Sequence, residues 1–257
     1  DVKSELIKSW EAGVEVRFFN NRLGLDVAWY KSNATRQLLN LPMNSLSGYS
    51  NVKVNAGDIQ NQGWEVMLNA TPIQTKEFNW DMTLNFSMND NKIIELAEGV
   101  KQYNLGGYDN LNIYAQAGGN YGEIWGTKFA RVTDEKSPYY GQLITTKEGL
   151  PTATSQAEKI GDQQATGLLG WTNNFSYKNF SLSFMIDARL GGEIFSATQA
   201  ALQKVGTAEC TAPGGERPDV LVEGVYLDDS GNYVPNTTEI TQQQYWTTVA
   251  GASGNLG

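Results

Sequence analysis

The sequence predicts an all-β protein made of long antiparallel strands. Six stretches alternate large apolar residues with small or polar ones, and a β-strand places alternate side chains on opposite faces. The stretches come in pairs that are joined by short polar turns. Such strands form either a segment of an antiparallel transmembrane β-barrel, whose apolar face meets lipid, or a soluble sandwich, whose apolar face meets a second sheet.

The three pairs follow one another along the chain. In residues 10–18 the apolar side chains take the even positions, and in residues 23–30 they take the odd ones. Residues 64–71 and 80–89 form the second pair, and 80–89 is the clearest case because every even position is apolar and every odd one is polar. In the last pair, Leu169 and Trp171 are apolar whereas Gly170 and Thr172 are small or polar, and the same alternation returns in residues 180–187. Each stretch predicts one strand.

Hydropathy favours the membrane alternative. The mean hydropathy is −0.41, and the sequence contains 12 Tyr and 7 Trp. It has no apolar run of about 18 residues, so we expect no transmembrane helix. Outer-membrane barrels show the same moderate hydropathy because half of each strand faces water. The sequence shows neither an initiator Met nor a signal peptide, and we expect it to be part of a longer polypeptide.

Charge and composition argue against several kinds of chemistry. The net charge of −9 is unsuited to a nucleic-acid surface, which needs clustered Lys and Arg. Cys210 is the single cysteine and histidine is absent, so metal clusters, Cys/His pairs and Ser-His-Asp triads are missing. We therefore expect no enzyme activity, no cofactor and no metal site.

The connections predict an orientation. Short links at residues 19–22, 72–78 and 178–179 are typical of periplasmic turns, whereas long links belong outside the cell. The long links are residues 33–62, 90–166 and 191–257. Two segments inside the second long link, residues 125–132 and 142–146, either both cross the membrane or both fold outside it. The chain thus has six or eight spanning strands, with both of its ends on the extracellular side.

Three stretches carry a family resemblance. The first is LSGY at 46–49 with VNAGDIQNQGWE at 54–65 and TPI at 71–73. The second is IGD at 160–162 with GWTNNFSYKNF at 170–180, residues 187–192 and IFS at 194–196. The third is QYW at 244–246. Together they resemble the SusC/RagA family of TonB-linked outer-membrane nutrient transporters over essentially the whole chain.

The resemblance implies both an architecture and a function. It implies a barrel of about 22 strands with a plugged lumen in the outer membrane of a Gram-negative bacterium. It also implies import of oligosaccharides or oligopeptides under a SusD-like lipoprotein lid, powered through TonB. This sequence departs from the family pattern because it lacks the plug, the segment that contacts TonB and the closing strands. Residues 1–257 are therefore expected to form a partial barrel domain with long extracellular loops.

The alternation assigns side chains to the two faces of such a barrel. We expect these residues to face lipid: Leu25, Val27, Leu68, Leu84 and Phe184. We expect these to face a wet lumen: Glu15, Arg17, Asp26, Glu65, Asp81, Asp187 and Arg189. The rings of these residues lie near strand ends, where aromatic belts form: Trp10, Trp29, Trp64, Trp80 and Tyr177.

The best candidate substrate contacts are aromatic residues in the long links. Flat rings stack on sugars or pack against peptide side chains at little entropic cost. The candidates are Tyr49, Tyr103, Tyr108, Tyr114, Tyr121 and Trp125. An alternative is that these rings are used in folding the loops themselves.

Several other loop motifs are better explained by turns. Gly57 and Gly63 flank an Asn-rich strand entry, where glycine serves left-handed backbone positions. Residues 118–122 superficially resemble a phosphate-binding loop, but no buried parallel strand precedes them and no helix follows. Asp134-Glu135 does not match a calcium loop, and residues 228–232 read as the tip of a hairpin.

Two functional classes follow from the sequence. The first is a part of a non-enzymatic importer. The second is a soluble all-β carbohydrate-binding module, which would stay monodisperse without detergent.

Overall fold

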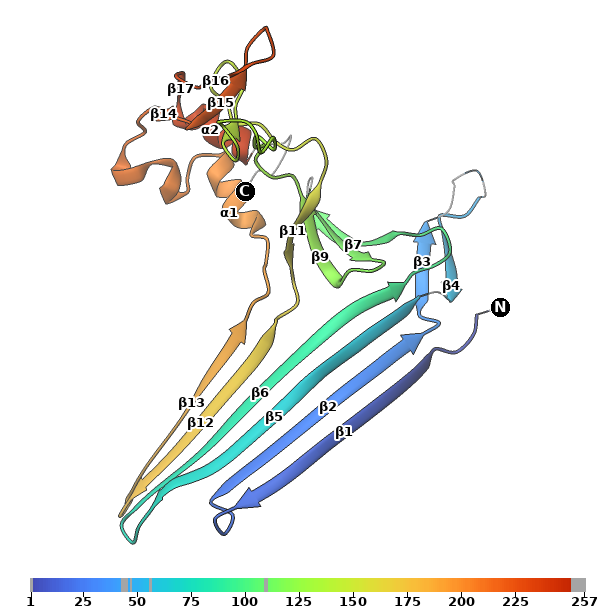
Figure 1. The fold of residues 1–257 in the computed structure, drawn as a ribbon, viewed down its shortest axis with the longest axis vertical. Helices are drawn as coiled ribbons and strands as arrows, with labels where there is room; N and C mark the ends of the chain where they lie inside the picture. The colour runs from blue at the N-terminus through green and yellow to red at the C-terminus, as the bar shows by residue number, and fades with distance from the viewer. Residues whose placement is uncertain (1, 43–45, 47, 56, 109–110, 251–257) are drawn as a thin grey trace. The chain divides into compact units, whose positions relative to one another are not determined.

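A computed structural model describes residues 2–42, 46, 48–55, 57–108 and 111–250 (Figure 1). Ser47 and Ala56 of the resemblance motif, and the chain end at Gly257, lie outside the described residues. The chain divides into two compact units. Unit 1 comprises Asp1–Tyr103, Ala115–Gly122 and Asp162–Glu193, and unit 2 comprises Asn104–Tyr114, Glu123–Gly161 and Ile194–Gly257.

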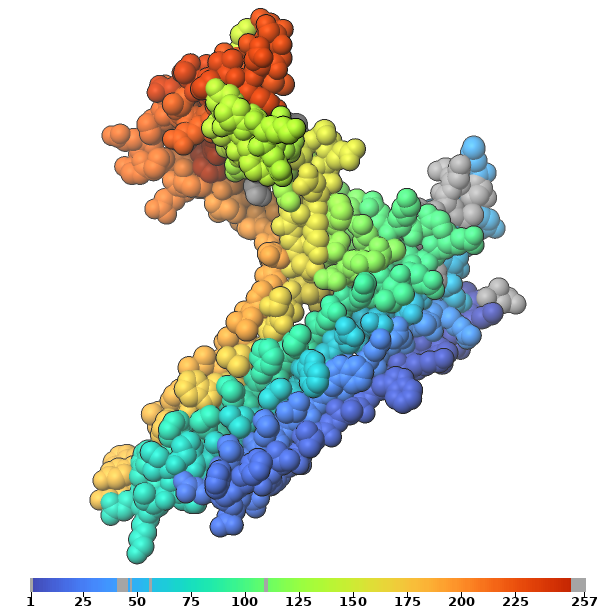
Figure 2. All heavy atoms as spheres, in the orientation of Figure 1, coloured from blue at the N-terminus to red at the C-terminus, as the bar shows by residue number. Residues whose placement is uncertain are grey.

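Unit 1 contains a sheet of six long strands in the order β1-β2-β5-β6-β12-β13. Every neighbouring pair is antiparallel. Figure 1 shows these strands side by side, and in Figure 2 their atoms form one continuous surface. The strands are β1 (Leu6–Phe18), β2 (Leu23–Thr35), β5 (Asp58–Gln74), β6 (Phe78–Glu95), β12 (Gly167–Tyr177) and β13 (Phe180–Leu190). All six predicted stretches are confirmed as strands.

The register places like residues in rows across the sheet. One row runs through Val14, Val27, Val66, Phe86 and Leu169. The next row, on the opposite face, runs through Glu15, Asp26, Met67, Asn85, Gly170 and Asp187. Because the side-chain period is two, this register keeps apolar and polar rows on separate faces over all six strands.

The turn between β1 and β2 has three residues in the left-handed region. Phe19, Asn20 and Asn21 have φ of 54°, 56° and 67°, a conformation that asparagine tolerates and that a bulky residue such as phenylalanine rarely adopts. Arg22 then donates from Nη2 to the carbonyl oxygens of Thr71 and Pro72, each at 3.0 Å. The first hairpin is thereby tied to the end of β5.

An aromatic cluster covers the apolar face near the turns. Phe175 stacks on Trp80 at 5.5 Å and on Phe184 at 6.0 Å between ring centroids. Asn173 lies among them with only 1% of its surface exposed, and its Oδ1 accepts a hydrogen bond of 3.1 Å from Trp80 Nε1. The register thus puts this asparagine on the apolar face, between Met82 and Phe184.

Smaller sheets occupy the long links. A two-stranded sheet pairs β3 (Leu38–Pro42) with β4 (Asn51–Asn55), and a four-stranded sheet has the order β11-β9-β8-β7. The strands of the latter are β7 (Gln102–Tyr108), β8 (Leu111–Gln116), β9 (Tyr121–Gly126) and β11 (Glu158–Asp162).

The rest of unit 2 combines short strands with short helices. β10 (Leu143–Ile144) runs parallel to β15 (Gly224–Leu227), which pairs with β16 (Tyr233–Pro235). β14 (Val220–Leu221) pairs with β17 (Glu239–Ile240). The helices are α1 (Ala197–Lys204), α2 (Gln242–Val249), η2 (Glu209–Thr211) and η3 (Pro213–Gly215). No helix in the described part of the chain is long and apolar enough to cross a membrane.

The long sheet has six strands, and the two further segments predicted as candidates lie outside it. Residues 125–132 leave β9 at Gly126 and then make only isolated bridges, while residues 142–146 hold the two-residue strand β10. Neither segment joins the long sheet.

The predicted tip at residues 228–232 is confirmed, because Asp228 Oδ1 accepts hydrogen bonds from the backbone N–H groups of Ser230 at 2.9 Å and Asn232 at 2.8 Å.

Candidate functional site

A groove of about 520 Å³ lies along the polar face of the long sheet in unit 1. Its lining includes four carboxylate side chains: Glu11, Asp26, Glu65 and Asp187. The floor between them is made by small residues, among them Gly13, Ala28 and Gly170. Small residues on adjacent strands leave space above the backbone, so a groove forms where the acidic residues stand higher.

The charge of this groove is not balanced by its own protein neighbours. Within the described residues, none of the four carboxylates forms an ion pair. Arg17 pairs with Glu15 at 2.6 Å on its own strand, and Arg189 donates from Nη2 to the carbonyl of Gln163 at 2.8 Å. Glu15 and Asp26 are directly opposite each other on β1 and β2, and such like charges repel. The polar face is therefore negatively charged and needs water or cations beside it.

Gly63, near the start of β5, is required by the close packing of Tyr30 and the Met88 backbone around it. A Cβ at this position would lie 2.1 Å from the carbonyl oxygen of Met88 and 2.7 Å from the hydroxyl of Tyr30. Tyr30 covers the glycine and donates to Asn89 Oδ1 at 2.9 Å. Gly57 has φ of +87° and fits the turn interpretation, whereas Gly63 is explained by this close approach.

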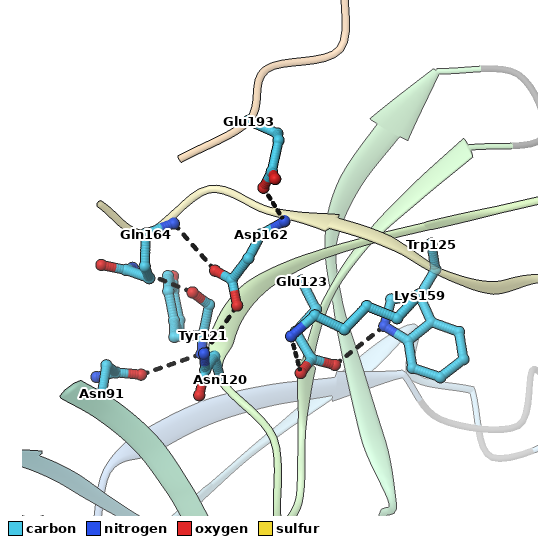
Figure 3. Close-up of polar contacts among 9 residues, drawn as sticks. All are labelled: Asn91, Asn120, Tyr121, Glu123, Trp125, Lys159, Asp162, Gln164 and Glu193. Carbon is cyan, nitrogen blue, oxygen red and sulfur yellow. Dashed lines mark hydrogen bonds and ion pairs between the residues drawn. The ribbon is translucent and has the colours of Figure 1, made fainter. Parts of the chain in front are cut away.

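An asparagine network continues from this point. Asn61 Oδ1 accepts hydrogen bonds from the side-chain amides of Asn89 at 3.1 Å and Asn91 at 2.8 Å. Asn91 is buried and in turn accepts from the backbone N–H of Tyr121 at 3.0 Å (Figure 3). Gln164 donates to the carbonyl of Tyr121 at 3.1 Å. These amides hold the segments beyond β8 and before β12 against the end of β6.

Asp162, from the predicted IGD motif, organises the chain before β12. Its Oδ2 accepts from Asn120 Nδ2 at 2.7 Å, and its Oδ1 accepts from the backbone N–H of Gln164 at 3.0 Å. Its own N–H donates to Glu193 Oε2 at 2.7 Å (Figure 3). The described residues contain no group of three His, Cys, Asp or Glu side chains placed to hold a metal ion, so this cluster is a structural network.

Unit 2 contains an ion pair between a buried carboxylate, Glu123, and an exposed lysine, Lys159. Lys159 Nζ lies 2.8 Å from Glu123 Oε1, and Trp125 Nε1 donates to Glu123 Oε2 at 3.1 Å (Figure 3). Tyr114 packs edge-on against Trp125 at 6.4 Å between ring centroids. Sequence reasoning missed the ion pair because its partners are 36 residues apart and no spacing rule connects them.

The six predicted substrate contacts are divided between the two units. Tyr114 and Trp125 pack together, and Tyr108 lies 6.2 Å from the ring of Phe195. Tyr103 donates to the carbonyl of Asn40 at 3.3 Å. Tyr49 is 70% exposed and Tyr121 is 44% exposed. Direct ligand contact by any of these rings stays a prediction.

Comparison with known proteins identifies the family. Residues 1–187 match the family described as TonB dependent receptor-like, beta-barrel. The chain belongs to this family. The TonB-dependent receptor assignment decides between the two folds left open by the alternation, since it makes the long sheet a segment of a transmembrane barrel. The apolar rows therefore face lipid, and the carboxylate groove faces the lumen.

Related TonB-dependent receptors, one of them named SusC, confirm the resemblance seen in the motifs. The chain is 29% identical over 236 residues to TonB-dependent receptor P3 of Formosa agariphila, a match covering 82% of this chain and 23% of that protein. It is 27% identical over 213 residues to TonB-dependent receptor SusC of Bacteroides thetaiotaomicron, covering 76% of this chain and 20% of that one. The chain thus spans about a quarter or less of these receptors.

Solved structures show the same fold. The structure of the RagAB peptide transporter superposes with a TM-score of 0.63 at 21% identity, covering 98% of this chain and 33% of that chain. The RagAB peptide importer in its closed-closed state gives a TM-score of 0.62 at 23% identity, covering 79% and 23%.

Proposed function

We propose that this chain forms part of an outer-membrane importer that takes up oligosaccharides or oligopeptides by a TonB-dependent mechanism. The observation that carries the proposal is the two-faced six-stranded sheet, with apolar rows on one side and a carboxylate-lined groove on the other. A hydrated nutrient needs a polar wall beside its path. The likeness to SusC and to the RagAB peptide importer supports this function.

The same likeness supports a partner and an orientation. We infer that a SusD-like lipoprotein covers the extracellular side, where residues 33–62, 90–166 and 191–257 would face it. TonB would act through the plug, which lies outside this sequence. The exposed rings of Tyr49, Tyr108 and Tyr121 remain candidates for contact with substrate or lid.

In this proposal the chain acts by binding and gating, without chemistry of its own. Its family comprises transporters and receptors rather than enzymes. The groove carboxylates are spread over β1, β2, β5 and β13, in keeping with a hydrated wall. Cleavage of nutrients would then belong to other proteins.

Uptake by intact cells tests the function. Cells carrying the complete transporter are given labelled oligosaccharides and oligopeptides, with a TonB-deficient strain as control. We expect TonB-dependent accumulation of at least one class, and binding without cleavage by the purified transporter. TonB-independent accumulation would overturn the proposal, as would cleavage that survives repurification and is lost when one groove carboxylate is substituted.

A further inference from the structure

Unit 2 contains a cleft of about 720 Å³ whose lining includes none of the residues singled out in the sequence as substrate contacts. Its lining includes Arg131, Tyr140, Leu143, Val220, Glu223 and Tyr245. The residues come from three separated stretches of chain, so the cleft exists only in the folded unit. It combines one guanidinium, one carboxylate, two phenol rings and an apolar wall.

The backbone around the cleft is closely packed. Leu143 pairs with Gly224 where β10 runs parallel to β15, and Arg131 bridges to Leu143 on the other side of β10. A Cβ on Gly224 would lie 2.5 Å from the carbonyl oxygen of Leu143. Only glycine permits this close approach of the two strands. The pairing keeps the backbone of Arg131, on one side of β10, at a fixed position relative to Glu223, which precedes β15 on the other side.

Arg131 has most of its hydrogen-bonding capacity unused. Its Nη1 donates to the carbonyl of Gly141 at 2.7 Å. No carboxylate among the described residues lies within ion-pairing distance of it, and the side chain is exposed. A guanidinium has five N–H donors arranged in a rigid fork that matches a carboxylate. The bond to Gly141 orients the fork and leaves the other donors for a ligand.

Two phenol groups stand ready to add hydrogen bonds. Within the described part of the chain, the hydroxyls of Tyr140 and Tyr245 have no hydrogen-bond partner. Tyr245 packs edge-on against Trp246 at 5.1 Å between ring centroids, which fixes its ring. Burial raises the pKa of Tyr245, so its hydroxyl keeps the proton that it would donate.

We propose that this cleft binds a carboxylate group of the imported nutrient, with Arg131 as the anchor and Tyr140 and Tyr245 as additional donors. The inference rests on the proposed import function and deepens it by naming the chemical group recognised. Paired charge-assisted hydrogen bonds are stronger than neutral ones. The carboxylate has two sources among the nutrients considered, the C-terminus of an oligopeptide and a uronic acid of an oligosaccharide.

Glu223 separates these two sources. It lines the same cleft and has no ion-pair partner among the described residues. An oligopeptide carries an ammonium group that this carboxylate would attract, whereas an oligouronide offers only more negative charge. Removing the charge of Glu223 should therefore weaken peptide binding and leave or improve uronide binding.

The test is a titration of the complete transporter in detergent with four probes. They are tetra-alanine, its C-terminal amide, trigalacturonate and the methyl ester of trigalacturonate. The key variant is Arg131→Met. Arg217→Met is the matched control, because Arg217 is also an exposed arginine of unit 2 that donates to a backbone carbonyl, that of Gly206 at 2.8 Å. Arg131→Lys, which keeps the charge without the fork, serves if Arg131→Met does not fold.

We expect Arg131→Met to weaken binding of a carboxylate-bearing probe by about tenfold or more, while its binding of the amide and ester probes is unchanged and Arg217→Met shows no change. Arg131→Lys should weaken the same probe by a smaller factor. Glu223→Gln then assigns the source: weaker tetra-alanine binding indicates the peptide carboxylate, and unchanged or tighter trigalacturonate binding indicates the uronate.

Equal affinities of the unaltered transporter and Arg131→Met for both carboxylate probes would overturn the inference, as would equal binding of each carboxylate probe and its amide or ester. Loss of the lid lipoprotein from Arg131→Met with unchanged probe affinities would also overturn it, since the cleft would then be a docking surface. If neither acid binds while TonB-dependent uptake of a neutral nutrient continues, the cleft proposal is wrong and the proposed function stands. Absence of all uptake would reject the function instead.

Discussion

The two units differ in where their apolar side chains go. On the apolar face of the long sheet, Trp64 is 47% exposed and Met88 39% on the central strands β5 and β6, and Val14 is 58% exposed on the edge strand β1. In unit 2, Val225 is 0% exposed, Val132 1% and Ile240 3%, because short strands and helices enclose their own core. A barrel segment uses the bilayer as its apolar surroundings, while unit 2 builds a core from its own residues.

The units also differ in how their strands find partners. β1 and β2 pair across a short turn, as do β12 and β13. In unit 2, β10 pairs in parallel with β15, which lies about eighty residues further on, as the bond from Thr145 Oγ1 to the Val225 carbonyl illustrates. In the six-stranded sheet the pairing of β6 with β12 also joins segments about ninety residues apart, but its other neighbours pair over shorter separations, so local alternation specifies most of the first unit.

The largest expected effect concerns accessibility, where the two units should give opposite results. In the complete transporter with Cys210 replaced by Ser, a cysteine at Ser230 should be labelled by an impermeant maleimide on intact cells, and one at Asn179 should not. Cys210 is exposed, so it must be removed first. Labelling at Asn179 without labelling at Ser230 would reverse the orientation.

A charge placed on the lipid face should destabilise the barrel strongly. Leu84 pairs with Leu68 and Trp171 on the apolar face, and Leu84→Arg should cost roughly 2–4 kcal/mol near the bilayer midplane. The matched control is Asn85→Arg, one residue further on the lumen face, which should be tolerated. The measurement is the folded fraction after reconstitution and urea titration. Equal loss for both variants would contradict the assignment of faces.

A methyl group at Gly63 should test the packing within the lumen face. Gly63→Ala forces a Cβ against the Met88 carbonyl and the Tyr30 ring, and such overpacking costs about 1–3 kcal/mol. Gly170→Ala is the control, because no atom lies within 4 Å of a Cβ there, and it should change the unfolding free energy by less than about 0.5 kcal/mol. Equal unfolding free energies for both variants in urea would show that Tyr30 does not constrain this position.

The sequence predicted unit 1 well and unit 2 poorly, for physical reasons. Side-chain alternation needs only the strand itself, so residues 80–89 specify a strand with a lipid face and a wet face. The tip at Asp228 was recognisable because Asx turns are local. The Glu123–Lys159 pair and the Arg131 cleft depend on segments brought together by the fold. Even in the long sheet, alternation does not explain every residue. It places the polar side chain of Asn173 on the apolar face, and only the aromatic neighbours of Asn173 in the folded sheet explain its presence there.

Loss of a helix cap should destabilise a small part of unit 2. Thr241 and Gln244 form a capping box at the start of α2, with Thr241 Oγ1 accepting from the Gln244 N–H at 3.2 Å. Thr241→Ala should lower the local unfolding free energy by about 1 kcal/mol, seen as faster hydrogen exchange in residues 242–249. Thr247→Ala, inside the helix, should have no such effect. Unchanged exchange in Thr241→Ala would mean that packing alone holds α2.

The smallest expected effect is a pH dependence at the hairpin tip of unit 2. Backbone hydrogen bonds from Asn232 and Ser230 hold the pKa of Asp228 below its ordinary value. Since the pKa is lower in the folded state, the tip is stabilised above the unfolded-state pKa of about 3.9, and the stabilisation is lost as the pH falls through the folded-state pKa. The amides of Ser230 and Asn232 should therefore lose protection from hydrogen exchange in acid, after correction for the intrinsic exchange rate.

Two variants serve as controls. Asp228→Asn keeps the acceptor oxygen without the titration, so protection of these amides should not depend on pH in this range. Asp229→Asn should behave like the unaltered protein, because Asp229 makes only an exposed ion pair with Lys147 at 3.6 Å. Loss of protection in acid that persists in Asp228→Asn would assign the effect to another group.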